Sequence, residues 1–66
     1  MKVTAHACRS GRWWAVEIFD VPEVGALHTQ ARRLDQIPAM AADAVASVLE
    51  IDPASVEVDV EVVAEI

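Results

Sequence analysis

Polar and apolar residues alternate with a period of two along the first part of the chain, as in strands with one buried and one exposed face. In Lys2–Arg9 the even positions are Lys, Thr, His and Cys, whereas residues 3, 5 and 7 are Val or Ala. Trp13–Phe19 also alternates, and its β-branched and aromatic residues favour a strand more strongly. The glycine in Ser10-Gly11 accepts a positive φ, so the pattern predicts a hairpin with its turn at these two residues.

A loop and a third strand are predicted next. Pro22 and Gly25 interrupt the alternation within Asp20–Gly25, as residues of a turn do. Alternation resumes in Leu27–Arg32, with Leu, Thr and Ala on one face and His, Gln and Arg on the other. This segment is predicted to be a short strand.

The period then changes from two to between three and four, which predicts an amphipathic helix. Its apolar stripe consists of Leu34, Ile37, Ala41, Val45 and Val48. Pro38 fits only in the first helical turn, so the helix is expected to begin near Leu34 or Asp35, with Asp35 as the N-cap or as a first-turn acid. Asp52-Pro53 is expected to end it, because a residue that precedes proline avoids the helical region.

A last strand shows the clearest alternation in the chain. Valines at positions 56, 58, 60 and 62 alternate with Glu57, Asp59 and Glu61, giving one apolar and one acidic face. The predicted order is β-β-β-α-β within a single domain, residues 1–66. The fold class is therefore α+β, with one mainly antiparallel sheet and a single helix packed on one face.

A single helix covers only one face of a sheet, so the other face is expected to meet solvent or another protein chain. The residues predicted for this open face are Thr4, His6, Cys8, Trp13, Glu17, His28, Gln30, Glu57, Asp59 and Glu61. They combine a large aromatic residue with a row of carboxylates. This face, or an edge of the sheet, is where we expect a partner to bind.

The charge is divided unevenly along the chain. Eleven Asp and Glu residues against five Lys and Arg residues give a net charge of −6, and 55% of the residues are hydrophobic, which argues against disorder. Residues 1–34 carry a net +2 and residues 35–66 a net −8. An acidic domain is poorly suited to nucleic acid, whose recognition requires clustered basic residues, and is better suited to a basic protein.

Length and cysteine usage add three expectations. A chain of 66 residues buries only about 60% of its unfolded surface, so a monomer is marginally stable. A homodimer or higher oligomer is expected, formed through a sheet edge or the alanine-rich side of the helix, because an exposed edge invites pairing with another chain. The single cysteine, Cys8, fits a reducing compartment. With neither a signal peptide nor a membrane span expected, the predicted location is cytoplasmic.

Catalytic, metal and cofactor sites are not expected. Cys8 and His6 share a strand face, but no oxyanion loop accompanies them, and a reactive thiol needs an electropositive setting. His6, Cys8 and His28 show no metal-ligand spacing. The acidic residues of the last strand form an even row, which is typical of a solvated strand face rather than of a two-metal centre.

Tryptophan and arginine residues are the remaining candidates for contacts. Trp13 and Trp14 point to opposite faces if both lie in a strand, so Trp14 is expected in the core and Trp13 either at an interface or over the hairpin. Arg32 and Arg33 near the helix start oppose the helix dipole, and they serve either as solvated surface residues or as contacts to acids of a partner.

The middle of the chain resembles the HicB antitoxin family. The resemblance lies in Trp14–Gly25 (WAVEIFDVPEVG), in Leu27–Arg32 (LHTQAR) and in the helix and strand that follow, and it covers roughly residues 2–63. Two features depart from the family pattern. Ala31-Arg32-Arg33 stands where Gly-Asp-Thr is usual, and the chain stops at Ile66, without the family's C-terminal DNA-binding segment.

The resemblance implies an antitoxin core with a reduced RNase H-like sheet and no nuclease activity. It implies a HicA-like partner, a small basic RNA-cleaving toxin, and no operator binding by this chain itself. Under this hypothesis the partner-binding residues are Trp13, Asp20, Glu23, Arg32, Glu57, Asp59 and Glu61. The alternatives are a homo-oligomeric regulatory module without a toxin and a small hydrolase that uses Cys8 and His6.

Overall fold

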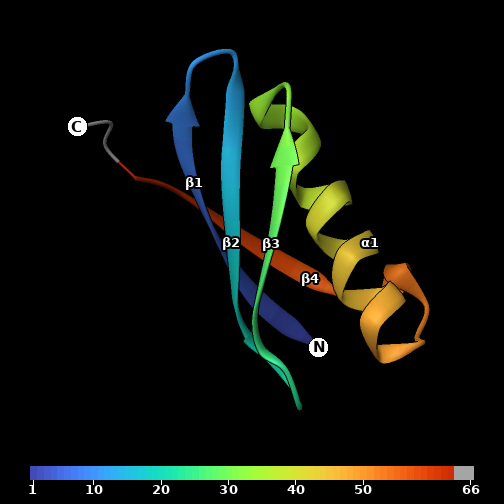
Figure 1. Ribbon diagram of the computed structural model, residues 1–66. Coiled ribbons are helices and arrows are strands. Elements are labelled where there is room, and N and C mark those ends of the chain that lie inside the picture. Colours follow the sequence, from blue (N-terminus) through green and yellow to red (C-terminus); the bar gives the residue numbers. More distant parts are fainter. Residues whose placement is uncertain (64–66) are drawn as a thin grey trace.

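Four strands and one α-helix make up the computed structural model, which describes residues 1–63 (Figure 1). The strands are β1 (Lys2–Ser10), β2 (Trp13–Val21), β3 (Gly25–Ala31) and β4 (Glu57–Val63). The helix α1 (Ile37–Leu49) lies between two short 3-10 helices, η1 (Leu34–Gln36) and η2 (Pro53–Ser55). The predicted order β-β-β-α-β and the α+β class are confirmed. Residues 64–66, the end of the predicted domain, lie outside the described residues.

The sheet has the order β3-β2-β1-β4 and is mixed. β2 pairs antiparallel with both β1 and β3, whereas β4 pairs parallel with β1, from Lys2 opposite Glu57 to Cys8 opposite Val63. The crossover through α1 thus returns the chain to the far side of β1 rather than to β3. In Figure 1, β4 passes beside β1 while the helix lies at one side of the sheet. β3 and β4 are the two edge strands.

The first hairpin has its turn one residue later than predicted. Ser10 pairs with Trp13, so the two loop residues are Gly11 and Arg12, and Gly11 has the positive φ of 60° that such a tight turn requires. The β2–β3 connection is also shorter than predicted. β2 continues to Val21 past an irregularity between Phe19 and Val21, which keeps Val21 buried in the core.

The helix differs from its prediction at both ends. Helical structure does begin at Leu34, but as the 3-10 helix η1, in which Asp35 is a first-turn acid. Asp35 does not cap α1: its carboxylate accepts a 2.7 Å hydrogen bond from Arg33, and the N-cap residue of α1 is Gln36. α1 ends at Leu49 because Glu50 adopts the left-handed conformation (φ 57°), before Asp52-Pro53 is reached. The Asp52 side chain instead accepts a 2.9 Å hydrogen bond from the Ala54 N–H and caps η2.

The predicted helical stripe is wrong at two of its five positions. Leu34 and Val48 are exposed, whereas Ala42 and Ala46 join Ile37, Ala41 and Val45 on the buried side. Alanines on the helix meet alanines on the sheet, where Ala5 and Ala7 of β1 are completely buried. Small side chains on both sides let the backbones approach closely, because no long side chain separates them.

The core has few large side chains. Those that are almost completely inaccessible are Ile18, Ile37, Val3, Val16 and Val45. Trp14, predicted to fill the core, is only half-buried at its margin, where the Arg9 guanidinium lies 5.4 Å from the ring centroid. Val58 and Val60 pack partly against the core, but Val62 on the same face is 55% exposed. The apolar face of β4 is therefore covered at its start and open at its end.

Candidate protein-binding surface

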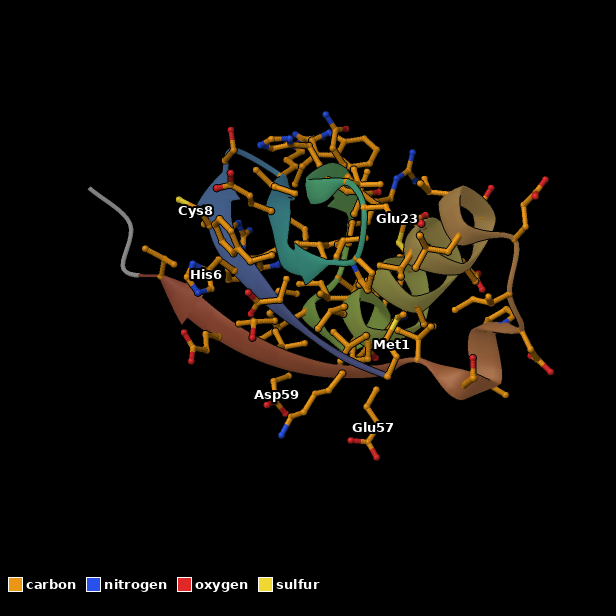
Figure 2. All side chains as sticks on the ribbon, turned by 90° about the horizontal axis from the view of Figure 1, so that it is seen from below. Met1, His6, Cys8, Glu23, Glu57 and Asp59 are labelled. Carbon is orange, nitrogen blue, oxygen red and sulfur yellow. The ribbon has the colours of Figure 1, made fainter. Side chains whose placement is uncertain are left out.

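The sheet face opposite α1 carries the polar residues that the alternation predicted. The register places residues 4, 6 and 8 of β1 beside residues 15, 17 and 19 of β2 and residues 59, 61 and 63 of β4. Figure 2 shows His6 and Cys8 on the side of the sheet away from the helix. A shallow depression of about 560 Å³ lies here, with lining residues that include His6, Cys8, Glu17, His28, Gln30 and Val63.

A row of alternating histidines and glutamates crosses all four strands on this open face. His28 pairs with Glu17, Glu17 lies opposite His6, and His6 lies opposite Glu61. His28 Nε2 is 3.2 Å from Glu17 Oε2, and His6 Nε2 is 3.1 Å from Glu61 Oε2. The two histidines are therefore occupied by carboxylates of neighbouring strands, which fits ordinary cross-strand pairing.

The acidic row of β4, defined as Glu57, Asp59 and Glu61, is exposed on an edge strand. Figure 2 shows Glu57 and Asp59 pointing away from the helix. Lys2 Nζ lies 3.1 Å from Asp59 Oδ2, and this hydrogen bond, with the charge of Asp59 and a smaller effect of Glu57, raises the pKa of Lys2 above its usual value. Within residues 1–63, Glu57 forms no ion pair.

Trp13 and Arg32 lie together near the start of α1. The Arg32 guanidinium lies 5.0 Å from the centroid of the Trp13 ring, a cation–π arrangement, and Trp13 is 42% exposed. Both residues line a second depression with Asp35 and the helix residues Gln36, Ala39 and Met40. Trp13 therefore forms part of a small exposed apolar surface beside the C-terminal end of β3.

Asp20, near the opposite end of β2, and Glu23, in the β2–β3 connection, form the tip group, and both have a positive φ (63° and 71°). Trp13 and Asp20 are seven residues apart on one strand, or roughly 23 Å. The predicted partner-binding residues consequently fall into three groups: the tip, the Trp13–Arg32 patch and the acidic row of β4. The structure does not bring them together into one site.

Groupings that could hold a metal ion are not found among residues 1–63. No set of three or more His, Cys, Asp or Glu side chains in this range is arranged to hold a metal ion. Cys8 is exposed on the open face, and its Sγ approaches only the Arg9 carbonyl oxygen, at 3.9 Å. Every buried side-chain nitrogen or oxygen in the same range has a hydrogen-bond partner.

Sequence reasoning missed two features of this surface. The first is the pairing of Lys2 and His6 with the acidic row, which depends on the parallel pairing of β1 with β4, and in which the Lys2 ammonium neutralises part of the row. The second is Met40, a helix residue that lines the same depression as Trp13. A residue 27 positions away along the chain gives no local signal that the two share one surface.

No helix in the described part of the chain is both long and apolar enough to cross a membrane. Comparisons with protein-family models, with curated proteins and with solved structures found no match for this chain.

Proposed function

We propose that this chain is a protein-binding module, not an enzyme, and that it binds a basic protein through the acidic row of β4. The observation that carries this proposal is the exposure of Glu57, Asp59 and Glu61 on an edge strand. Carboxylates on alternate positions of one strand point to the same side, so they present a line of negative charge to a partner.

The edge strand adds backbone groups to this charge. β4 is paired on one side only, so its outward N–H and C=O groups are free to accept an extended segment from another chain. Val62 is exposed on the opposite face of the same strand. A segment that alternates basic and apolar residues would therefore match β4 on both of its faces.

The resemblance to HicB antitoxins suggests the kind of partner. A small basic RNA-cleaving toxin has the charge that the acidic row requires, and the cytoplasm is the compartment in which such a pair would act. In this proposal the module oligomerises and neutralises the toxin, and it does not itself bind nucleic acid. The net charge of −6 supports the last point, because phosphate contacts need basic clusters.

Co-expression with the product of the adjacent reading frame tests this function, and the proposal expects that product to be a short basic protein. We expect a complex on size-exclusion chromatography and protection of RNA from cleavage. In the E57Q/E61Q variant, association at low salt should slow by roughly tenfold, because rim charges act mainly on the association rate. The control variant D43N/E50Q changes the net charge equally but on the helix side.

Equal slowing by the two variants would show that net charge, not the acidic row, drives association. Failure of the wild-type chain to bind or to protect RNA would refute the antitoxin proposal itself.

A second candidate function is a homo-oligomeric regulatory module without a toxin. The observation that favours it is the other edge strand, β3, whose sequence GALHTQA contains no acidic residue, lysine, arginine or proline. Such an edge lacks the features that normally prevent strands of separate molecules from pairing.

A further inference from the structure

The two edges of the sheet differ in their capacity for self-association. An antiparallel pair of β4 strands centred on Asp59 would place Glu57 opposite Glu61 and Asp59 opposite itself, so like charges would repel along the whole strand. β3 has no such barrier, because His28 is its only ionisable residue. β3 hydrogen-bonds to β2 alone, so its outward backbone groups are free.

The ends of β3 carry opposite charges. Glu23 lies in the connection that leads into the strand, Asp20 lies near the end of β2, and Arg32 and Arg33 follow directly after the last residue of β3, Ala31. If a second β3 pairs antiparallel with this one, the acidic end of each strand lies beside the basic end of the other, so the pair contains two such contacts. A parallel neighbour would instead bring like charges together.

We propose that a second copy of this chain pairs with β3 through an antiparallel β3–β3 contact, giving a two-fold symmetric dimer with a continuous eight-stranded sheet. Centring the pair on His28 uses all seven residues of the strand and places Gly25 opposite Ala31 of the second copy. The same register sets Arg32 opposite Val24 and Arg33 opposite Glu23 of the second copy. Every pair joins positions of equal parity, so side chains on the two molecules stay on matching faces.

The neighbouring apolar patch fits this arrangement. Val24 is 43% exposed at the tip of the connection, and Arg32 lies over the exposed ring of Trp13. The register brings Val24 of the second copy beside this patch, so both exposed groups lose water on association. Pairing of β3 with β4 of another copy would leave free edges at both ends and build an open filament, whereas the β3–β3 contact closes.

This dimer deepens the second candidate function and does not depend on the basic partner. It is tested by sedimentation equilibrium of the whole chain. The contact is small for a protein interface, so we expect a dissociation constant on the order of 10 µM. Amide exchange should slow in β3 as the protein concentration rises, while the exchange of β4 amides stays constant.

A charge exchange supplies the specific test. R33E and E23R each turn the two symmetry-related Arg33–Glu23 attractions into repulsions, so each should weaken the dimer roughly tenfold. The double variant R33E/E23R restores the attraction in reverse and should recover most of the affinity. Circular dichroism and the thermal midpoint confirm that each variant folds.

Three results would overturn the β3–β3 contact: a monomer at every concentration, concentration-dependent protection in β4 instead of β3, or a double variant no tighter than either single one. The E57Q/E61Q variant separates this contact from the proposed function. It should dimerise like the wild type while associating more slowly with the basic partner. A dimer that forms without any toxin binding would support this inference and refute the antitoxin proposal.

Discussion

Two valines of α1 allow the orientation of the helix to be tested with one and the same substitution. Val45 is completely buried, whereas Val48, three residues later, is 48% exposed. The hydrophobic pattern alone places both in the buried stripe. Val45→Ala and Val48→Ala remove identical atoms from the same helix, so any difference between them reports on burial.

The expected magnitudes follow from the two environments. Val45→Ala removes two buried methyl groups, worth about 0.8 kcal/mol each. A residual cavity of up to about 50 Å³ adds up to about 1.2 kcal/mol, at 24 cal/mol per Å³. The higher helix propensity of alanine returns about 0.6 kcal/mol. The net loss is therefore about 1–2 kcal/mol for Val45→Ala and close to zero for Val48→Ala, where half the burial is missing and the propensity gain is the same.

Thermal and urea unfolding at one fixed protein concentration measure both variants. A domain of 66 residues has a free energy of unfolding of about 3–10 kcal/mol. A loss of 1–2 kcal/mol then lowers the midpoint by about 4–16 °C. Equal destabilisation by the two substitutions would show that the helix buries the predicted stripe, and a larger effect at Val48 would place α1 in a different rotation on the sheet.

Four further substitutions test the backbone and the surface. Glu50→Gly should stabilise the domain by about 0.5 kcal/mol in urea unfolding, because glycine tolerates the left-handed φ of 57° and an acid is removed from the negative end of the helix; a loss of stability would argue against that conformation. Gly11→Ala and Gly25→Ala should each lower the free energy of unfolding by about 1 kcal/mol or more. A Cβ at either glycine meets no atom within 4 Å, so the cost comes from the positive φ alone and should be larger at Gly25 (89°) than at Gly11 (60°). A smaller loss at Gly25 would contradict this order. The hydrogen bond to Asp59 raises the pKa of Lys2, so the stabilisation that this ion pair gives the folded state is complete below the unfolded pKa of 10.5 and is lost as pH rises through the higher folded pKa. The thermal midpoint of the wild type should therefore fall towards that of Lys2→Met above pH 10.5. A difference in midpoint that stays constant with pH would refute the linkage.

The elements and faces of this domain could be predicted from sequence because the alternation is local. In β1 and β2 the period of two decides which residues share a face. The register confirms that the positions of Trp13 and Glu17 are on one face of β2 and those of Trp14 and Val16 on the other. Helix orientation was harder. Alanine contributes little to a hydrophobic pattern but packs closest to a sheet, so the pattern leaves Ala42 out of the buried stripe.

Pairs that join distant strands were beyond local reasoning. The neutralisation of Asp59 by Lys2 depends on which strand becomes the neighbour of β1, and that choice is made by the crossover of the whole chain. The same holds for the position of Met40, which lines the same depression as Trp13. The predicted binding residues were therefore correct in being exposed, but their division into three groups could be found only from the fold.

The parallel pairing of β1 with β4 also determines when the sheet can be completed during synthesis. β1 is one of the two central strands, but its second neighbour, β4, begins at Glu57, which is 55 residues after its partner Lys2 in the chain. The β1–β2 hairpin and β3 can form as they leave the ribosome, but β1 keeps an unpaired edge until nearly the entire domain has been made. Such a delay slows folding and exposes that edge to other nascent chains. When β4 pairs with β1, it replaces the open edge of β1 with an acidic edge, which repels the same edge of another molecule.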